Sequence, residues 1–416
     1  MPEPLTTAVP LDTDEVDLVF EGKPQRLPCS IVLETNPRPR LLFKVTGTSP
    51  WMGWGDWPEQ LSIHIVHADV TCEAFEAYFK NGIIGLSPGR EPISVGRSED
   101  LREVHFDLIN FPSFWGLDGL SKRLSDDQLD IAAEGWQIEI RPPRNSPDLE
   151  AFRSPLYSVT HSCAMRKTDK ATFSSGEAQK LLTVLHDAMS FAAGRWVSPV
   201  FVRGFRTDQQ IAWKEWGTRP LHPNLGHVET WFDHHHGNTL AEILPGVLEL
   251  QKDTGRAATF HSALYWYVRS TGVAAGVDGG IILLQAALEL LSWQRFVVER
   301  KALSRKAFGK LPADAHIRRL IESCGIPTRI PVGLSDLAAT AKEPDWDGPK
   351  ALAAVRNLLV HPDRRSDLPY FDAWRLAEWY VELVLLRMVS FTGEYSDRTK
   401  AERWVGAVDR VPWAKP

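Results

Sequence analysis

Cysteine is scarce in this chain, which has only four cysteines among 416 residues. Cys29, Cys72, Cys163 and Cys324 lie far apart, and no two of them form a C-x-x-C pair. A disulfide framework needs several paired cysteines, and a zinc ribbon needs closely spaced pairs. The sequence therefore predicts reduced, structural thiols in a cytoplasmic protein.

Long apolar runs are also missing. The longest, GGIILLQAALELLSW, contains Gln285 and Glu289, and it is shorter than the roughly 20 residues that cross a bilayer. The first residues, MPEPLTTAVPLDTDEVD, are acidic and contain proline, unlike a secretory signal peptide. We expect no membrane-spanning segment and a cytoplasmic location.

Several motifs of enzyme active sites do not occur. The sequence contains no P-loop, no G-x-G-x-x-G and no H-E-x-x-H, so the usual support for Walker-type hydrolysis, dinucleotide chemistry and zinc proteolysis is lacking. Residues 85–89, GLSPG, match the nucleophile elbow of α/β-hydrolases. That elbow uses the backbone N–H after the serine, and Pro88 has none. We interpret this segment as a turn.

Positive charge is also limited, because the formal net charge is −6. It is unevenly distributed: residues 280–416 hold 21 Lys and Arg against 17 Asp and Glu, and the preceding residues hold 26 against 36. The front therefore carries −10 and the back +4. This balance argues against a general nucleic-acid coat protein but permits a polyanion to bind the back of the chain.

The hydrophobic period changes along the chain. Short runs rich in branched and aromatic residues, separated by turn-forming residues, predict strands; they cover residues 27–34, 40–48, 61–70, 103–111, 135–143, 156–165, 196–205 and 210–217. One helix is expected among them, over 176–194. A period of 3.6 predicts helices further on, over residues 239–251, 256–270, 280–302, 313–324, 348–360 and 371–391.

These patterns predict an α+β protein. We expect a β-rich, sandwich-like domain over residues 1–225, a linker loop over 226–238 and a helical domain over 239–416.

Two clusters in loops have more than one interpretation. Asp233, His234, His235 and His236, with His222 and His227 nearby, form either a metal site or a solvated linker loop. We favour the loop, because adjacent histidines seldom converge on one ion. Trp51, Trp54 and Trp57 either stack on a ligand ring or cap the end of a sandwich; we favour the structural role.

The segment RNLLVHP, residues 356–362, places polar groups in an amphipathic helix. At about 100° per residue, with Arg356 at 0°, Asn357 lies near 100° and His361 near 140°. The apolar side chains gather between roughly 200° and 320°; they are Leu352, Val355, Leu358 and Leu359. Pro362 disfavours the α conformation at the preceding residue, so His361 is expected in the last, frayed turn. A solvated helix end is the alternative to a functional site.

The spacing of Arg356, Asn357 and His361 resembles the R-x4-6-H motif of the HEPN superfamily. These are small helical domains, many of them metal-independent ribonucleases of toxins and antiviral defence. Glu289 in its apolar run resembles the core helix upstream of the motif, and the neighbouring long helices are similar to the family's bundle. The front half is similar in layout to defence proteins of the ApeA type. The resemblance implies a HEPN-like bundle over about 240–400.

The chemistry of RNA cleavage needs these residue types. A histidine transfers protons near neutral pH, and an arginine holds phosphate charge with a planar donor fork. The resemblance implies that Arg356 and His361 are catalytic, that Asn357 assists and that Glu289 is a fourth group. Glu289 is otherwise a buried structural acid paired with an arginine. No metal or cofactor is expected.

One copy of the helix supplies one arginine and one histidine, whereas the family brings two motifs across one cleft. We therefore expect a homodimer through the helical domain, with RNA as substrate. The front half would sense a trigger, a protein or a small molecule, or restrain the activity. The alternative is a HEPN-like module that binds a nucleotide or a protein without cleavage.

Overall fold

The computed structural model describes most of the chain. The described residues are 8–20, 23–35, 38–46, 61–80, 82–89, 91–117, 124–144, 156–272, 275–340, 346–361, 368–400 and 403–414. Trp51, Trp54 and Trp57 lie outside them, so the interpretation of these tryptophans stays a prediction.

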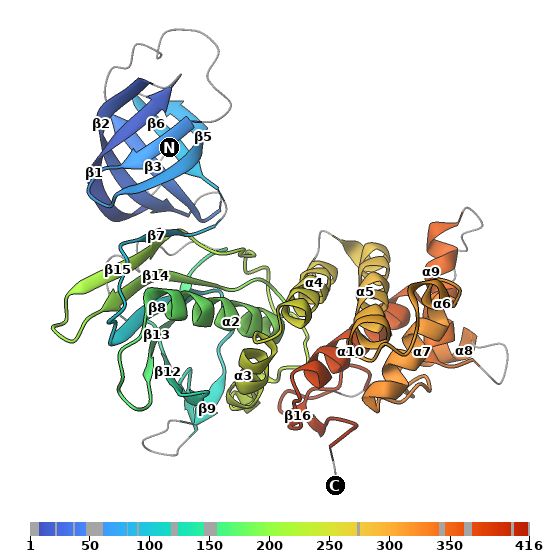
Figure 1. Ribbon diagram of the computed structural model, residues 1–416. Coiled ribbons are helices and arrows are strands. Elements are labelled where there is room, and N and C mark those ends of the chain that lie inside the picture. The colour runs from blue at the N-terminus through green and yellow to red at the C-terminus, as the bar shows by residue number, and fades with distance from the viewer. Residues whose placement is uncertain are drawn as a thin grey trace, which may run out of the picture. The chain divides into compact units, whose positions relative to one another are not determined.

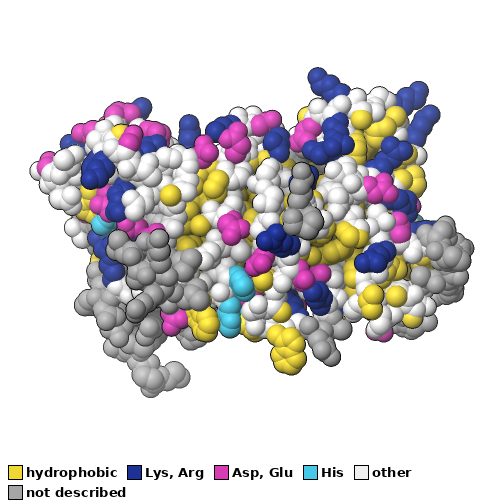
Figure 2. Space-filling model, turned by 90° about the horizontal axis from the view of Figure 1, so that it is seen from below, with side chains coloured by type: hydrophobic (Ala, Val, Ile, Leu, Met, Phe, Trp, Pro, Cys, Tyr) yellow, Lys and Arg dark blue, Asp and Glu magenta, His cyan; other side chains and the backbone are white. Residues whose placement is uncertain are grey.

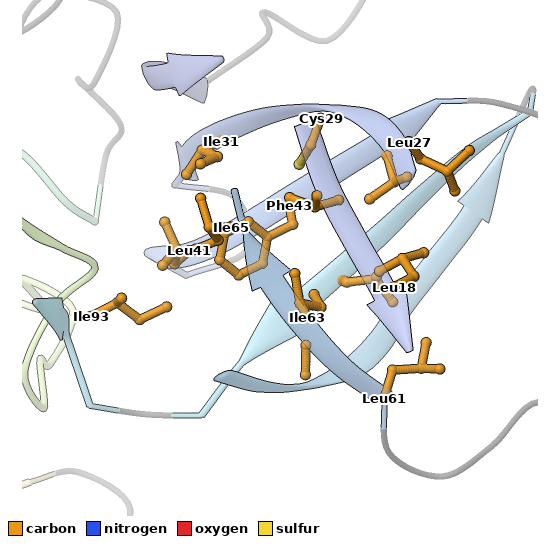
Figure 3. Close-up of a cluster of buried hydrophobic side chains, with 14 of the residues drawn as sticks. Leu18, Leu27, Cys29, Ile31, Leu41, Phe43, Leu61, Ile63, Ile65 and Ile93 are labelled. Carbon is orange, nitrogen blue, oxygen red and sulfur yellow. The ribbon is translucent and has the colours of Figure 1, made fainter. Parts of the chain in front are cut away.

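The first six strands form a closed antiparallel barrel in the order β1-β2-β3-β6-β5-β4 (Figure 1). Their bounds are β1 (Ala8–Phe20), β2 (Lys23–Glu34), β3 (Arg40–Thr46), β4 (Leu61–Ile65), β5 (Val70–Lys80) and β6 (Ile83–Pro88). Alternate side chains point inward; Leu18, Ile31, Phe43 and Ile63 are buried there (Figure 3). Closure pairs the edge strands β1 and β4 with each other, so the described strands of the barrel expose no sheet edge.

A seven-stranded sheet follows, in the order β11-β12-β13-β8-β14-β15-β7. Its strands are β7 (Ile93–Val95), β8 (Glu103–Ile109), β11 (Leu129–Ala133), β12 (Trp136–Arg141), β13 (Val159–Lys167), β14 (Ser198–Phe205) and β15 (Ile211–Trp216). The short strands β9 (Trp115–Leu117) and β10 (Leu124–Asp126) pair separately, and helix α2 (Ser175–Ala193) connects β13 to β14. The β-rich part is thus a barrel plus a sheet, not one sandwich.

Helices dominate the chain beyond residue 238. They are α3 (Thr239–Leu250), α4 (Thr254–Ser270), α5 (Gly276–Trp293), the π-helix η3 (Gln294–Glu299), α6 (Arg305–Phe308), α7 (Ala313–Cys324), α8 (Ser335–Thr340), α9 (Gly348–Val360) and α10 (Tyr370–Met388). A small pair of strands, β16 (Glu394–Tyr395) and β17 (Asp409–Arg410), comes last. The predicted α+β class, with a β-rich front and a helical back, is confirmed.

The described chain divides into two compact units that interleave in sequence. Residues 1–112, 135–182 and 197–226 form the first unit. Residues 113–134, 183–196 and 227–416 form the second, which we call the helical unit. The division near residue 226 lies where the hydrophobic period changes, but two earlier segments also join the helical unit.

Within residues 226–238, which the sequence predicts to be a solvated linker loop, residues 230–233 are buried. Trp231 is 0% exposed, and its backbone N–H donates to Glu382 Oε1 at 3.0 Å. The three consecutive histidines form the 3-10 helix η2 (His234–His236) and are half-buried. Burial of the large indole ring outweighs the polar composition of the segment.

The segment GLSPG is likewise not a turn. Gly85, Leu86, Ser87 and Pro88 lie inside strand β6, and Leu86 is fully buried in the barrel. Gly85 is needed there because a Cβ atom would overlap the ring of Tyr78 on β5. The segment is a strand because β6 pairs with both β3 and β5, and the local sequence does not reveal this pairing.

Helix α5 is the central helix of the helical unit and packs against α4, α10 and α7. Gly276–Glu299 is long and apolar enough to cross a membrane by length and composition. However, Ile281, Leu284 and Leu288 are fully buried within the unit. This packing is that of a core helix of the helical unit.

Candidate functional site

The motif helix α9 begins and ends where the sequence predicted. Asp347 caps its N-terminus by accepting a hydrogen bond from the Lys350 N–H, and the Arg318 guanidinium donates to both oxygens of Asp347 at 2.6 and 2.9 Å. Gly348 lies where a Cβ atom would overlap Tyr380 Oη on α10. The first turn is therefore held firmly by α7 and α10.

The last turn of α9 presents the polar motif to solvent. Arg356 is half-buried, and Asn357 and His361 are exposed. Arg356 Nη1 donates to Asn357 Oδ1 at 3.3 Å. His361 follows the last helical residue with an extended backbone, and its backbone N–H donates a hydrogen bond to the Asn357 carbonyl. The helix end before Pro362 is as predicted. Three polar side chains thus share one exposed helix end.

The apolar side chains of α9 are buried less uniformly than the helical wheel suggests. Leu352 and Val355 are buried, whereas Leu358 and Leu359 are only half-buried and Val360 is 43% exposed. The last turn therefore extends beyond the core that holds the first two turns. Its exposed apolar surface is available to a partner.

Glu289 is on α5, which packs against α9, and is half-buried. Its Oε1 accepts a hydrogen bond from Gln285 Nε2 at 3.1 Å. Among the described contacts, none joins Glu289 to Arg356 or His361, and none joins it to any arginine. The structure therefore brings together Arg356, Asn357 and His361, and leaves Glu289 with Gln285.

The histidines of the 233–236 cluster have separate structural partners. Asp233 accepts hydrogen bonds from the backbone N–H groups of His235 and Gly406, both at 2.8 Å. The ring of His235 stacks on Trp115 at 4.3 Å, and burial lowers the pKa of His234. Within the described ranges, no group of three His, Cys, Asp or Glu side chains is arranged to hold a metal ion.

A strongly basic segment lies on the helical unit. Residues 295–319 contain eight Lys and Arg against Glu299 and Asp314. Six of the basic side chains are exposed: Arg300, Lys301, Arg305, Lys306, Lys310 and Arg319. In Figure 2, Lys and Arg side chains gather over the part of the helical unit where Figure 1 shows α6, α7 and α9. Such a surface attracts polyanions.

Two groupings were missed by the sequence reasoning. His261 on α4 has its Nδ1 at 3.1 Å from Oδ1 of the buried Asp187 on α2. Arg256, Arg295 and Arg387 line one pocket between α4, η3 and α10. Both groupings join residues that are far apart in sequence, so no local motif predicts them.

Comparisons with known proteins place the chain near one family. Residues 96–225 match the YopA central domain and residues 253–410 match the YopA C-terminal domain. No solved structure matches the chain. Over 323 residues the chain is 28% identical to the SPbeta prophage-derived uncharacterized protein YopA of Bacillus subtilis (strain 168), covering 75% of this chain and 72% of that relative. In its middle and C-terminal parts, this chain is therefore similar to YopA.

Proposed function

We propose that the helical unit is a metal-independent, HEPN-type endoribonuclease, acting in the cytoplasm as an effector of antiviral defence or toxin type. The observation that carries the proposal is that the half-buried Arg356 and the exposed Asn357 and His361 lie together at the end of α9. A helix end held at its first turn and open at its last presents these groups to a large substrate.

His361 is suited to proton transfer. Its imidazole is exposed on the last turn, and imidazole exchanges a proton near neutral pH. In the proposed reaction, His361 takes the proton of an RNA 2′-OH. The 2′-oxygen then bonds to phosphorus, and the bond from phosphorus to the 5′-oxygen breaks. A second His361 protonates the leaving 5′-oxygen, and a 2′,3′-cyclic phosphate remains.

Arg356 is suited to hold the phosphate. Its guanidinium stays charged during the reaction and offers paired donors to the phosphate oxygens as charge develops on them. The hydrogen bond from Nη1 to Asn357 Oδ1 restricts its orientation. Asn357 thus serves as the positioning residue.

The basic segment 295–319 is suited to bind the RNA backbone. Its exposed Lys and Arg side chains replace counterions on phosphates, which makes binding weaken as salt rises. This interaction requires no particular base sequence. It provides affinity, whereas the α9 motif provides the chemistry.

A second copy of the chain would complete the site, since one chain supplies one His361. Val360 is 43% exposed and Phe371, at the start of α10, is 58% exposed. Val360 lies inside the motif and Phe371 follows it in sequence, where a homodimer contact would cover both side chains. The N-terminal barrel and sheet would then sense a trigger or restrain the nuclease.

RNA cleavage in the presence of EDTA tests the proposal. Purified protein is incubated with a labelled RNA, and the double variant Arg356→Ala/His361→Ala is the comparison. We expect 2′,3′-cyclic phosphate products from the wild-type chain and none from the variant. RNA binding without cleavage would instead support the non-catalytic binding module. Cleavage that persists in the variant would refute the assigned site, and Glu289→Gln in the same assay tests the predicted role of Glu289.

A further inference from the structure

A polar pocket lies inside the helical unit, apart from the α9 motif. It has a volume of about 260 Å³. Its walls come from α4, the end of α5, the π-helix η3, α7 and the end of α10. The charged residues that line it are Arg256, Arg295, Arg387 and Glu299.

The charge of this pocket is positive. Three guanidinium groups face one carboxylate, so the lining carries a net charge of +2. Glu299 neutralises part of this positive charge. Its Oε1 lies 3.2 Å from Arg256 Nε, and its Oε2 lies 3.4 Å from Arg295 Nη1. One carboxylate cannot neutralise three cations, which favours a bound anion.

Two of the arginines retain donors for a ligand. Arg295 Nε is buried and has no hydrogen-bond partner among the described residues. The Arg387 guanidinium lies over the Trp413 ring at 5.4 Å, and within the described part of the chain no carboxylate pairs with it. A buried unpaired donor costs free energy, and a bound oxyanion would remove that cost.

Irregular backbone shapes the pocket. After α5 the chain continues as a π-helix, in which the Arg300 N–H donates to the Arg295 carbonyl at 3.1 Å. The wider turn places Gln294, Arg295 and Glu299 together on the lining. Across the pocket, Arg256 Nη2 donates to the Met388 carbonyl, and Ser390 has a φ of +57°. Such π-helical turns and left-handed residues are frequent at functional sites.

We propose that this pocket binds the phosphate group of a small molecule, with Arg295 and Arg387 as the ligand-binding donors. The planar donor fork of arginine matches phosphate oxygens. The volume suits a phosphate or pyrophosphate group. The proposal does not depend on RNA cleavage, because it involves neither Arg356 nor His361.

Titration calorimetry of the full-length protein with pyrophosphate, at constant ionic strength, tests the proposal. Arg295→Gln and Arg387→Gln each remove a charged donor, so each should weaken binding about tenfold or more. Arg319→Gln is the matched control, because Arg319 is an exposed arginine on α7 and does not line the pocket. It should leave binding within about twofold of the wild type.

Melting curves establish that each variant is folded before its titration is interpreted, and adenosine serves as a ligand without phosphate. Three outcomes would overturn the proposal. One is no binding of millimolar pyrophosphate to the wild-type protein. Another is equal weakening by Arg319→Gln, which would indicate binding to the basic segment. The third is adenosine binding as tight as that of pyrophosphate.

Discussion

Arg356 and His361 lie at an exposed helix end, so their catalytic and structural contributions are separable. We predict that His361→Ala slows RNA cleavage about 10²–10⁴-fold by removing proton transfer. Arg356→Ala should have a comparable effect, because the developing phosphate charge loses its partner. The free energy of unfolding of both variants should lie within about 0.5 kcal/mol of that of the wild type. Cleavage rates and melting curves of the two single variants provide the measurement.

Arg97→Ala is the control for these variants, since the Arg97 side chain is 86% exposed and lies in the other unit. It should cleave at the wild-type rate. If alanine at 356 or 361 leaves the rate unchanged, the motif is only a helix end. If alanine there unfolds the protein, the residues are structural.

Glu378 on α10 belongs to a buried ionic cluster. Arg398 donates to both Glu378 and Glu382, and its Nη2 lies 2.6 Å from Glu382 Oε1. Tyr267 Oη also donates to Glu382 Oε1, at 2.5 Å. Two carboxylates thus share one buried arginine. Burial, with the charge of Glu382 adding to it, raises the pKa of Glu378 to about 8 although Arg398 opposes the shift. Burial therefore favours the protonated form of Glu378 in the native state.

This raised pKa predicts how stability depends on pH. In the unfolded chain Glu378 titrates near its ordinary pKa of about 4.3. The native state therefore holds an extra proton between about pH 4.3 and 8. The resulting stability is fully present below that window and is lost as the pH rises through it, by up to about 1.4 kcal/mol per pH unit. In thermal melts from pH 5 to 8, Glu378→Gln should flatten this decline.

Glu322→Gln provides the comparison, because Glu322 is an exposed carboxylate on α7. It should keep the wild-type pH dependence. A Glu378→Gln variant whose melting temperature changes with pH as steeply as that of the wild type would show that Glu378 is ionised in the native state.

Helix α9 combines a buried first part with a projecting end. Leu352 is 0% exposed, so Leu352→Ala should destabilise the protein by about 2–5 kcal/mol. Leu359 is only half-buried, and Leu359→Ala should cost about half as much or less. Urea unfolding of the two variants measures both effects. Equal losses would mean that the last turn is as deeply packed as the first.

Elements with a strong periodic pattern were predictable from the sequence. Predicted helices 313–324 and 348–360 coincide with α7 and α9, because each has a complete apolar stripe and a clear end. The helix predicted over 280–302 is α-helical only to Trp293 and continues as the π-helix η3, which the sequence does not distinguish because an inserted residue leaves the composition helical. Strand β1 (Ala8–Phe20) was missed because its acidic residues mask the buried Val16 and Leu18.

The composite site makes a prediction about pairs of chains. If two α9 motifs face one cleft, a heterodimer of a wild-type chain and an Arg356→Ala/His361→Ala chain holds only one His361 and lacks the second one that protonates the leaving oxygen. Co-expression of the double variant with the wild-type chain should therefore lower cleavage below that expected from the amount of wild-type chain alone. Light scattering on the same samples should show dimers at micromolar concentration. Activity of a strictly monomeric wild-type protein would contradict the composite site.

The sequence by itself determined the α+β class, the change from strands to helices and the place where α9 ends. These properties depend on hydrophobic period, capping residues and proline, which act over a few neighbouring residues. The sequence also places Arg356, Asn357 and His361 close together, because they lie within one and a half turns of one helix.

Only the tertiary structure decided which distant residues meet. The closed barrel depends on the pairing of β1 with β4, and the buried backbone N–H of Trp231 donates to Glu382, 151 residues further along the chain. Arg256, Arg295 and Arg387 share a pocket only because α4, η3 and α10 pack around it. Such groupings follow from how complementary surfaces fill the core, and no local pattern in the sequence encodes that packing.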